Sequence, residues 1–477
     1  MVLEGLPVSA RNARRMERPQ QRAGCAVKAA CLCIGILGFA ASAAPKTITV
    51  APGTSVPSIR EAVAMAQPGD RIEVQSGAYI GNLVLDKALT LVGIGKPVIH
   101  GEGRGSVITV TGGHCTLRGF VVERSGGMLV DEDSGVLLKS DRNLIQDNEL
   151  RDVLFGIYLY GAEHNQLVGN VIRGRPLPDL GERGSGIHIW NAGDNTIVNN
   201  SVSDARDGMY LQNAHNSTIR GNRVFNLRYG LHYMYSDDNV FEDNVFDNNV
   251  AGAAIMYSRN IQFRRNAFIH NRGFSSFGIL FQGTDECLAE DNVIADNVVG
   301  LFLETHSHSV FRRNLVASND VALEVFSSAA DNTFESNNFI DNLSPLQVVG
   351  KATTTRWNGV QAGNYWSDYD GYDLDADGIG DIPFKIQNVF EHMEGNYPRL
   401  RIYLLSPGSQ ALALAEKGFP VIEGSKEFDH RPLMRPVELP FTLPEKSRKP
   451  SVHLSSLLLP GLMLAVSMAV IRQGRRR

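Results

Sequence analysis

Several features that would point to common functions are missing from this sequence. It contains no Gly-rich phosphate-binding loop, and no Ser/His/Asp arrangement stands out. Positive charge is not in excess, because 46 Lys and Arg stand against 51 Asp and Glu, a net charge of −5. Removal of the first 43 residues, with six basic and two acidic side chains, changes this to −9. The charge balance therefore argues against a nucleic-acid partner.

Long helical patterns are also absent from the middle of the chain, where a short repeat takes their place. One copy runs from Gly156 to Ile172 and reads GIYLYGAEHNQLVGNVI. Most steps between copies are 22 residues, a period typical of stacked solenoid coils. A leucine-rich repeat has a similar period, but its Leu-x-x-Leu-x-Leu rows are absent. Further copies are Gly186–Val202, Gly208–Val224, Gly230–Phe246, Gly252–Phe268, Gly278–Ile294 and Gly300–Val316.

Each copy contains short alternating runs and has an asparagine near its end. Alternation predicts strands with Leu231, Tyr233, Val240 and Val245 on the inner face. We expect the asparagines to accept left-handed backbone at the corners and to stack as a hydrogen-bonded ladder. The chain is therefore predicted to be all-β, a right-handed parallel β-helix. The asparagines are Asn148, Asn170, Asn200, Asn222, Asn244, Asn266, Asn292, Asn314 and Asn337.

Cysteine is scarce, with 5 residues in the chain. Three of them, Cys25, Cys31 and Cys33, precede residue 44, and only Cys115 and Cys287 follow it. A solenoid brings together residues of neighbouring coils alone, so we expect these two thiols to stay unpaired.

The start of the chain resembles an export signal followed by a cap. A basic leader, the apolar stretch Ala29–Ala40 and the A-x-A site Ala41–Ala43 predict a signal peptide over residues 1–43. A short amphipathic helix is expected at Ser58–Ala66, where it would cover the open end of the solenoid.

The remaining chain is predicted to contain four parts. The β-helix occupies residues 44–350, and a closing segment with an Asp-rich turn occupies 351–398. A Pro-rich extension over 399–450 includes a helix at Gln410–Lys417. Residues 451–477 are apolar and then basic, which indicates attachment to a membrane or to a membrane partner.

Two columns of side chains are predicted to point outward from one sheet. Neighbouring coils lie about 4.8 Å apart, and same-face residues of one strand lie about 6.6 Å apart. His232, Met234 and Met256 would therefore converge, with His188 two coils away. Imidazole and thioether ligands suit Cu(I). The alternative interpretation is an aromatic-rich sheet covered by a loop or a partner. His306 and His308 are a weaker candidate and are expected to lie in a solvated turn.

A string of aspartates follows the repeats. Asp373, Asp375, Asp377 and Asp381, with Gly378 after the third, resemble a calcium loop of alternating carboxylates. The twelfth position, where an EF-hand has Glu, is Phe384. A calcium-stiffened turn and a simple polar turn are equally compatible with this pattern.

A polysaccharide enzyme is the main competing function. Aromatic columns can stack on sugar rings, and Asp204, Asp207, Asp237 or Asp238 are available as acids, bases or calcium ligands. Glycosidases need two carboxyl groups at a defined separation, and the repeats do not identify such a pair.

The motifs as a whole resemble a known family. The segment from Ser58 to Tyr79 is similar to β-helices of the carbohydrate-binding and sugar-hydrolase type. The Asn repeats, Gly363–Asp373, Asp377–Phe384 and His430–Pro436 resemble the NosD family of periplasmic maturation factors for nitrous oxide reductase, and the similarity spans nearly the whole mature chain.

This resemblance implies a copper-related accessory role in denitrification. Such proteins act with an ABC transporter made of an ATPase and a membrane subunit, so ATP hydrolysis is expected in the partner and not here. The implied partners are that transporter, a copper chaperone as donor and the apo-reductase as acceptor. Three hypotheses follow: a non-enzymatic Cu(I) delivery scaffold, a periplasmic polysaccharide lyase, hydrolase or epimerase, and a metal-free docking platform. The cargo is either copper or a sulfur species.

Overall fold

The computed structural model describes residues 44–350, 352–387, 390, 392–393, 397–403, 406–418 and 427–440. The predicted signal peptide and the apolar C-terminal segment lie outside these residues. Within the described ranges, none of the helices combines the length and the apolar composition needed to cross a membrane.

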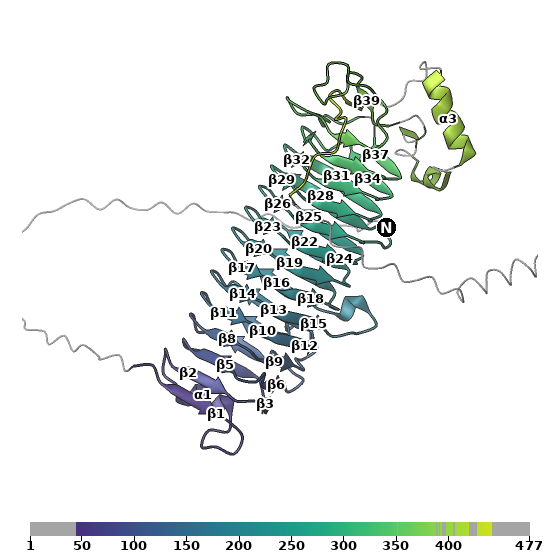
Figure 1. Cartoon of the computed structure of the whole chain (residues 1–477). Helices are drawn as coiled ribbons and strands as arrows, with labels where there is room; N and C mark the ends of the chain where they lie inside the picture. Colours follow the sequence, from purple (N-terminus) through teal and green to yellow (C-terminus); the bar gives the residue numbers. More distant parts are fainter. Residues whose placement is uncertain are drawn as a thin grey trace, which may run out of the picture. The chain divides into compact units, whose positions relative to one another are not determined.

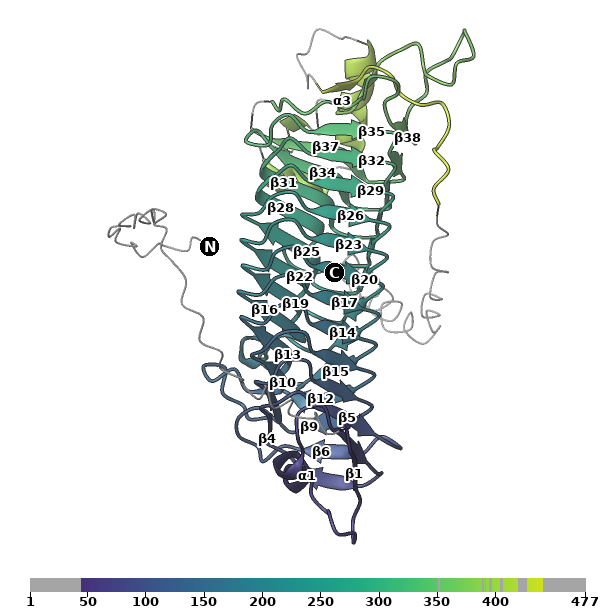
Figure 2. The same ribbon diagram turned by 90° about the vertical axis from the view of Figure 1, so that its left-hand side faces the viewer.

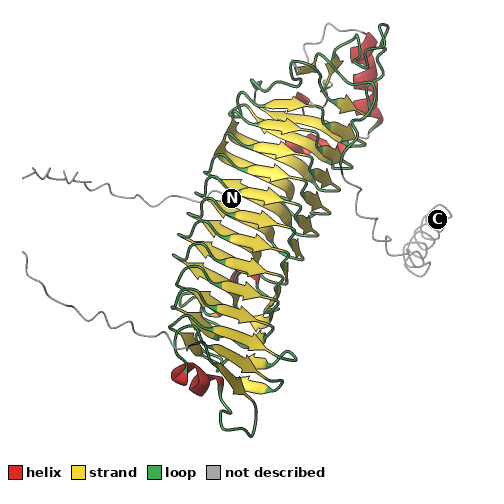
Figure 3. Cartoon of the chain, turned by 60° about the vertical axis from the view of Figure 1, so that its left-hand side comes forward, coloured by secondary structure: helices red, strands yellow, loops and turns green. Residues whose placement is uncertain are grey.

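The repeats fold into a parallel β-helix, as the period predicts (Figure 1). Each coil contributes one strand to each of three parallel sheets, and Figure 3 shows these strands stacked along the solenoid. Apart from the two end strands of each sheet, every strand pairs with the strand one coil before and one coil after it, so neighbouring coils lie in a fixed register.

The first sheet has 13 strands. They are β1 (Thr47–Val50), β2 (Arg71–Val74), β5 (Thr90–Gly93), β8 (Thr116–Arg118), β11 (Leu144–Gln146), β14 (Gln166–Val168), β17 (Thr196–Val198), β20 (Thr218–Arg220), β23 (Val240–Glu242), β26 (Gln262–Arg264), β29 (Leu288–Glu290), β32 (Val310–Arg312) and β35 (Thr333–Glu335).

The second sheet has 12 strands and includes the longest ones, of 9 residues. They are β4 (Leu83–Leu85), β7 (Ile108–Val110), β10 (Ser134–Leu138), β13 (Phe155–Tyr160), β16 (Ile187–Trp190), β19 (Asp207–Gln212), β22 (Tyr229–Met234), β25 (Ala251–Met256), β28 (Phe277–Asp285), β31 (Val299–Ser307), β34 (Val321–Phe326) and β37 (Ser344–Val349).

The third sheet again has 13 strands. They are β3 (Ala78–Ile80), β6 (Val98–His100), β9 (Val121–Glu123), β12 (Glu149–Val153), β15 (Val171–Gly174), β18 (Ser201–Ser203), β21 (Arg223–Phe225), β24 (Val245–Asp247), β27 (Ala267–Ile269), β30 (Val293–Ala295), β33 (Leu315–Ala317), β36 (Asn338–Ile340) and β38 (Tyr365–Trp366).

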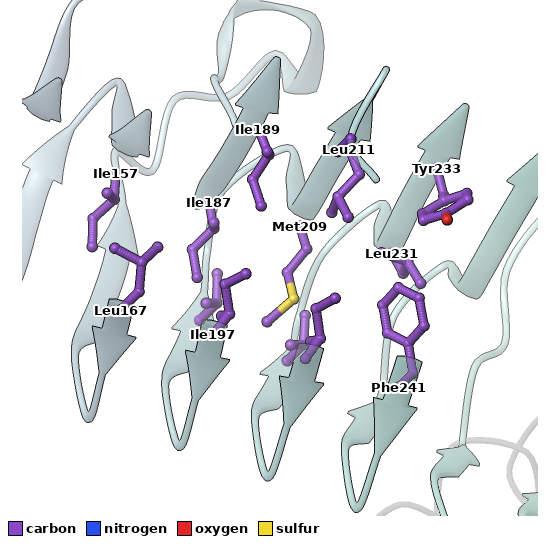
Figure 4. Close-up of a cluster of buried hydrophobic side chains, with 14 of the residues drawn as sticks. Ile157, Leu167, Ile187, Ile189, Ile197, Met209, Leu211, Leu231, Tyr233 and Phe241 are labelled. Carbon is purple, nitrogen blue, oxygen red and sulfur yellow. The ribbon is translucent and has the colours of Figure 1, made fainter. Parts of the chain in front are cut away.

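The core is a continuous column of apolar side chains between the sheets (Figure 4). Leu231 and Tyr233 face inward, as predicted. The inner assignment of Val240 and Val245 is wrong, because Phe241 and Phe246 are the fully buried residues of β23 and β24. Alternation allows either phase on a three-residue strand, and the larger aromatic side chains fill the core. Cys115 and Cys287 are buried there as free thiols.

The predicted asparagine ladder is present. From Asn148 to Asn337, the backbone N–H and the side-chain amide of each residue donate to the Oδ1 atom of the next asparagine. The expected left-handed backbone lies one residue earlier, at positions such as Asp147, Gly169 and Asn199. An extended ladder asparagine can point its side chain inward, whereas its predecessor makes the corner.

Apart from one 3-10 turn between β15 and β16, the helices and the extra strand pair lie toward the ends of the described chain. The predicted cap is α1 (Ile59–Met65), which buries Ile59, Ala62 and Val63 next to the first strands. The C-terminal helix α3 spans Pro407–Gly418 and includes the predicted Gln410–Lys417. A short antiparallel pair joins β39 (Phe384–Lys385) to β40 (Phe428–Asp429), and two 3-10 turns, η1 and η2, span Leu180–Glu182 and Pro398–Tyr403.

The stretch after β40 runs beside the last coils (Figure 2). Asn338 binds the backbone of Val437 through both a donor and an acceptor bond of 2.8 Å. Leu439 packs against an apolar patch on the outside of the third sheet, which includes Val293 and Leu315. The C-terminal side of the chain thus covers part of the solenoid wall.

Candidate metal centre on the second sheet

The outer face of the second sheet carries the two predicted side-chain columns in the predicted register. One column contains Tyr158, His188, Tyr210, His232, Ala254, Leu280 and Phe302. The other contains Tyr160, Trp190, Gln212, Met234, Met256, Gln282 and Glu304. The residues between them, such as Leu211 and Tyr233, point into the core.

His232, Met234 and Met256 are close neighbours on this face. His232 and Met234 are two residues apart on β22, and Met256 on β25 is the register partner of Met234. The partner of His232 on β25 is Ala254, a small and buried residue. All three side chains are half-buried. The arrangement offers one nitrogen and two sulfur donors to a soft ion.

A buried carboxylate holds His232. The Nδ1 atom of His232 lies 3.3 Å from Oδ2 of Asp207, which is completely buried. Arg228 also donates to Asp207, with bonds of 2.9 and 2.7 Å. Burial works to raise the pKa of Asp207, but the hydrogen bonds from His232 and Arg228 outweigh it and lower the pKa to about 2. Asp207 is therefore an anion at neutral pH.

His188 does not join this group. The Tyr210 ring lies between the two imidazoles, with its centroid 4.5 Å from that of His188 and 4.7 Å from that of His232. His188 is 9% exposed, and neither ring nitrogen has a hydrogen-bond partner among the described residues. Burial lowers its pKa to about 3, so the imidazole is neutral. His188 forms a separate, aromatic-lined position with Phe155, Tyr158 and Tyr210 around it.

The second histidine candidate differs from its expected place. His306 is not in a solvated turn; it is fully buried in the core and stacks on Phe281. Its Nδ1 atom lies 2.6 Å from the hydroxyl of Thr284, the register partner in the previous coil. Thr305 in the long strand β31 has left-handed backbone, with φ of 50°, and shifts the alternation by one residue. Leu301 and Leu303 therefore face inward before it, and His306 faces inward after it. His308 is exposed, as expected, and contacts Asp285.

The aspartate string brings three of its four members together. Oxygen atoms of Asp373, Asp375 and Asp377 lie within 4.8 Å of one another, which is suitable for a hard cation. Asp381 accepts a 2.7 Å bond from the Leu374 backbone and is not in this group. The chain also places a second exposed group together, Glu163, His164 and Asp194, which was not predicted from the sequence.

The carboxylates considered for sugar chemistry have structural partners. Asp207 is neutralised by arginine, and Asp204 accepts a 2.8 Å bond from Ser203 at a left-handed corner. Asp237 accepts from the Arg259 backbone, and Asp238 accepts from the side chain of Asn260. These contacts match the use of aspartate at the corners of the repeat.

The chain is similar to known proteins over most of its length. A family described as periplasmic copper-binding protein (NosD) matches residues 172–371. The probable ABC transporter binding protein NosD of Pseudomonas aeruginosa is 36% identical over 381 residues, which cover 76% of this chain and 88% of that protein. The protein of the same description from Stutzerimonas stutzeri is 32% identical, with 83% and 91% covered.

Among solved structures, the family 28 exopolygalacturonase of Yersinia enterocolitica superposes with a TM-score of 0.47 and 12% identity, over 66% of this chain and 78% of that one. The identities to the two bacterial relatives extend over most of each chain, far beyond the shared repeats. The chain therefore belongs to the NosD family.

Proposed function

We propose that this protein is a periplasmic copper-delivery scaffold, which binds Cu(I) and presents it during assembly of the copper centres of nitrous oxide reductase. The observation that carries the proposal is the strand register, which makes Met256 the partner of Met234, two residues from His232 on β22. The name of the matching family, a periplasmic copper-binding protein, supports the choice of metal.

The donor set suits Cu(I) better than a harder ion. Thioether sulfur and neutral imidazole nitrogen are soft or borderline ligands, whereas calcium and magnesium take oxygen. A site with few ligands on an open sheet face also lets a second protein supply competing ligands. His232, Met234 and Met256 would hold the ion, and exposure on one side would permit its transfer.

In this proposal, ATP is hydrolysed by a partner protein. The two bacterial relatives are named as binding proteins of an ABC transporter, which supports a role beside a transporter whose ATPase subunit hydrolyses ATP. In this scheme the chain is not an enzyme. A copper chaperone delivers Cu(I), the apo-reductase receives it, and the apolar C-terminal segment contacts the membrane or the transporter.

The test is Cu(I) affinity of the purified mature protein, measured anaerobically by competition with a chromogenic Cu(I) chelator. The triple variant His232→Ala/Met234→Ala/Met256→Ala should lose high-affinity binding. A matched control is His270→Ala/Met65→Ala/Met128→Ala, which removes an imidazole paired with Asp247 and two exposed thioethers elsewhere. The control should bind as the unaltered protein does. Unchanged affinity in the triple variant would dismiss this site.

A polysaccharide lyase, hydrolase or epimerase is the second candidate. The observation that favours it is the aromatic pair Tyr160 and Trp190, register partners on the outer face, with Tyr160 46% exposed. Turnover of a uronate polymer, abolished by Asp204→Asn or Asp207→Asn, would support this function over copper delivery. A metal-free docking platform would instead show tight binding to the transporter and no Cu(I) affinity.

A further inference from the structure

Asp207 is an unusual residue on the outer side of the second sheet. It begins β19, one coil before His232, and its side chain is 0% exposed. Its register partner on the next coil is Tyr229, and its neighbour along the sheet on that coil is His232. The period aligns these coils but does not by itself place a carboxylate against an imidazole, since the two residues occupy different columns.

Arginine fixes this carboxylate in place. Nε of Arg228 donates to Oδ1 at 2.9 Å, and an outer guanidinium nitrogen donates to Oδ2 at 2.7 Å. Arg206 adds a 3.3 Å contact to Oδ2. A bidentate pair of this kind restrains both the position and the plane of the carboxylate. The Oδ2 atom that faces Nδ1 of His232 is thus held by groups other than His232.

An anion beside Nδ1 selects one form of the imidazole. The carboxylate only accepts hydrogen bonds, so Nδ1 carries a proton, and in the neutral imidazole Nε2 then keeps its lone pair. Within the described residues, Nε2 of His232 has no hydrogen-bond partner. Metal-binding histidines usually donate their second nitrogen to a carboxylate or carbonyl, which sets the tautomer and the ring orientation.

We infer that Asp207 is a positioning residue of the copper site: it holds His232 in the Nδ1–H form and leaves Nε2 as the metal ligand. This inference rests on the proposed function, which supplies the identity of the metal. The tautomer of His232, however, is a property of the metal-free protein and can be measured without copper. Asp207 contacts His232, not the ion.

His188 provides an internal comparison. It occupies the same column as His232, two coils earlier, and both of its nitrogens lack partners among the described residues. Within the part of the chain that the structure describes, no carboxylate bonds to His188 and fixes its tautomer. If Asp207 only neutralised Arg206 and Arg228, the contact with His232 would be incidental, and the tautomer of His232 would not depend on it.

The experiment compares Asp207→Asn with Asp247→Asn in the full mature protein. Asp247 is the matched control, because it contacts Nδ1 of His270 at 2.8 Å on the third sheet, away from the methionines. Side-chain nitrogen NMR, assigned with His232→Ala, should show the Nδ1–H form of His232 in the metal-free protein. In Asp207→Asn the amide offers N–H in place of one oxygen, so the Nε2–H form should gain population.

Cu(I) affinity is the second measurement. Asp207→Asn should weaken binding about 10- to 100-fold, the usual effect of losing such a partner, and Asp247→Asn should change it less than twofold. An Nε2–H form of His232 in the unaltered protein would overturn the inference. This measurement needs no Asp207 variant, so the inference can still be tested if Asp207→Asn fails to fold.

The outcomes separate the two proposals. If the triple variant of His232, Met234 and Met256 keeps its affinity, the copper site is wrong, while the nitrogen spectra still report on Asp207. If the triple variant loses Cu(I) but Asp207→Asn retains both the affinity and the Nδ1–H form, the role of Asp207 alone is overturned.

Discussion

The rings of Tyr235 and Tyr257 stack with centroids 5.2 Å apart, although both residues have left-handed backbone, with φ of 50° and 52°. At the same corner, two preceding coils use Asn191 and Asn213, also with positive φ. Tyrosine appears in the two coils that carry Met234 and Met256. A bulky residue is costly in this conformation, and such strain is found preferentially at functional sites.

Replacing both tyrosines by asparagine should therefore stabilise the protein. Left-handed backbone costs an ordinary L-residue about 1–2 kcal/mol, which is more than one stacked pair contributes, about 0.5–1.5 kcal/mol. We expect Tyr235→Asn/Tyr257→Asn to raise the free energy of unfolding by about 1 kcal/mol in guanidinium titrations. The reciprocal control, Asn213→Tyr, should lower it. A less stable double variant would contradict the strain argument.

His188 should be removable with a gain in stability. Its two nitrogens lack partners among the described residues, and each buried unsatisfied polar group costs about 1–3 kcal/mol. Since Phe155, Tyr158 and Tyr210 surround the ring, His188→Phe should fit and raise the unfolding free energy. Cu(I) affinity should stay unchanged because Tyr210 separates His188 from His232. A drop in affinity would instead make His188 a ligand.

Stability should fall as the pH is lowered from 6.5 toward 3. Burial lowers the pKa of both His188 and His306 to about 3 from an ordinary value of 6.5, so the unfolded chain binds more protons in this window. Each imidazole contributes up to about 1.4 kcal/mol per pH unit, and the effect is absent above 6.5. His188→Phe should flatten the slope of unfolding free energy against pH between 6.5 and 4. An equal slope in both proteins would argue against a buried neutral imidazole.

Calcium should stabilise the closing segment through Asp373, Asp375 and Asp377. At a free concentration ten times the dissociation constant, a bound ion adds about 1.4 kcal/mol. We expect millimolar Ca²⁺ to raise the melting temperature of the unaltered protein and not that of Asp375→Asn. Asp381→Asn should retain the response, because Asp381 binds the Leu374 backbone outside the cluster. If Ca²⁺ leaves the unaltered protein unchanged, the string is a simple polar turn.

Much of the candidate site was predictable, because a constant repeat length sets which residues of neighbouring coils lie side by side. Once the copies around Tyr210, His232 and Ala254 are aligned, their order on one sheet follows, and the structure has the same pairs. The separation of His188 from His232 by Tyr210 follows from the same alignment. The asparagine ladder was predictable for this reason as well.

It was harder to predict from the sequence which residues of a strand face the core and which are buried. On three-residue strands such as β23, alternation allows either Val240 or Phe241 to face inward, and the packing of large rings decides between them. His306 lies in the core because left-handed backbone at Thr305 shifts the alternation within β31 by one residue. Alternation alone gives no information on where such a corner interrupts a strand.

The sequence alone determined the solenoid, the stacking order of its coils and the column that holds His232, because these follow from the repeat. Only the tertiary structure decided that Asp207, from a different column, lies against His232 and is held by Arg228. The physical reason is that coil register fixes neighbours along a column, whereas contacts between columns depend on the strand twist, side-chain rotamers and burial of each coil.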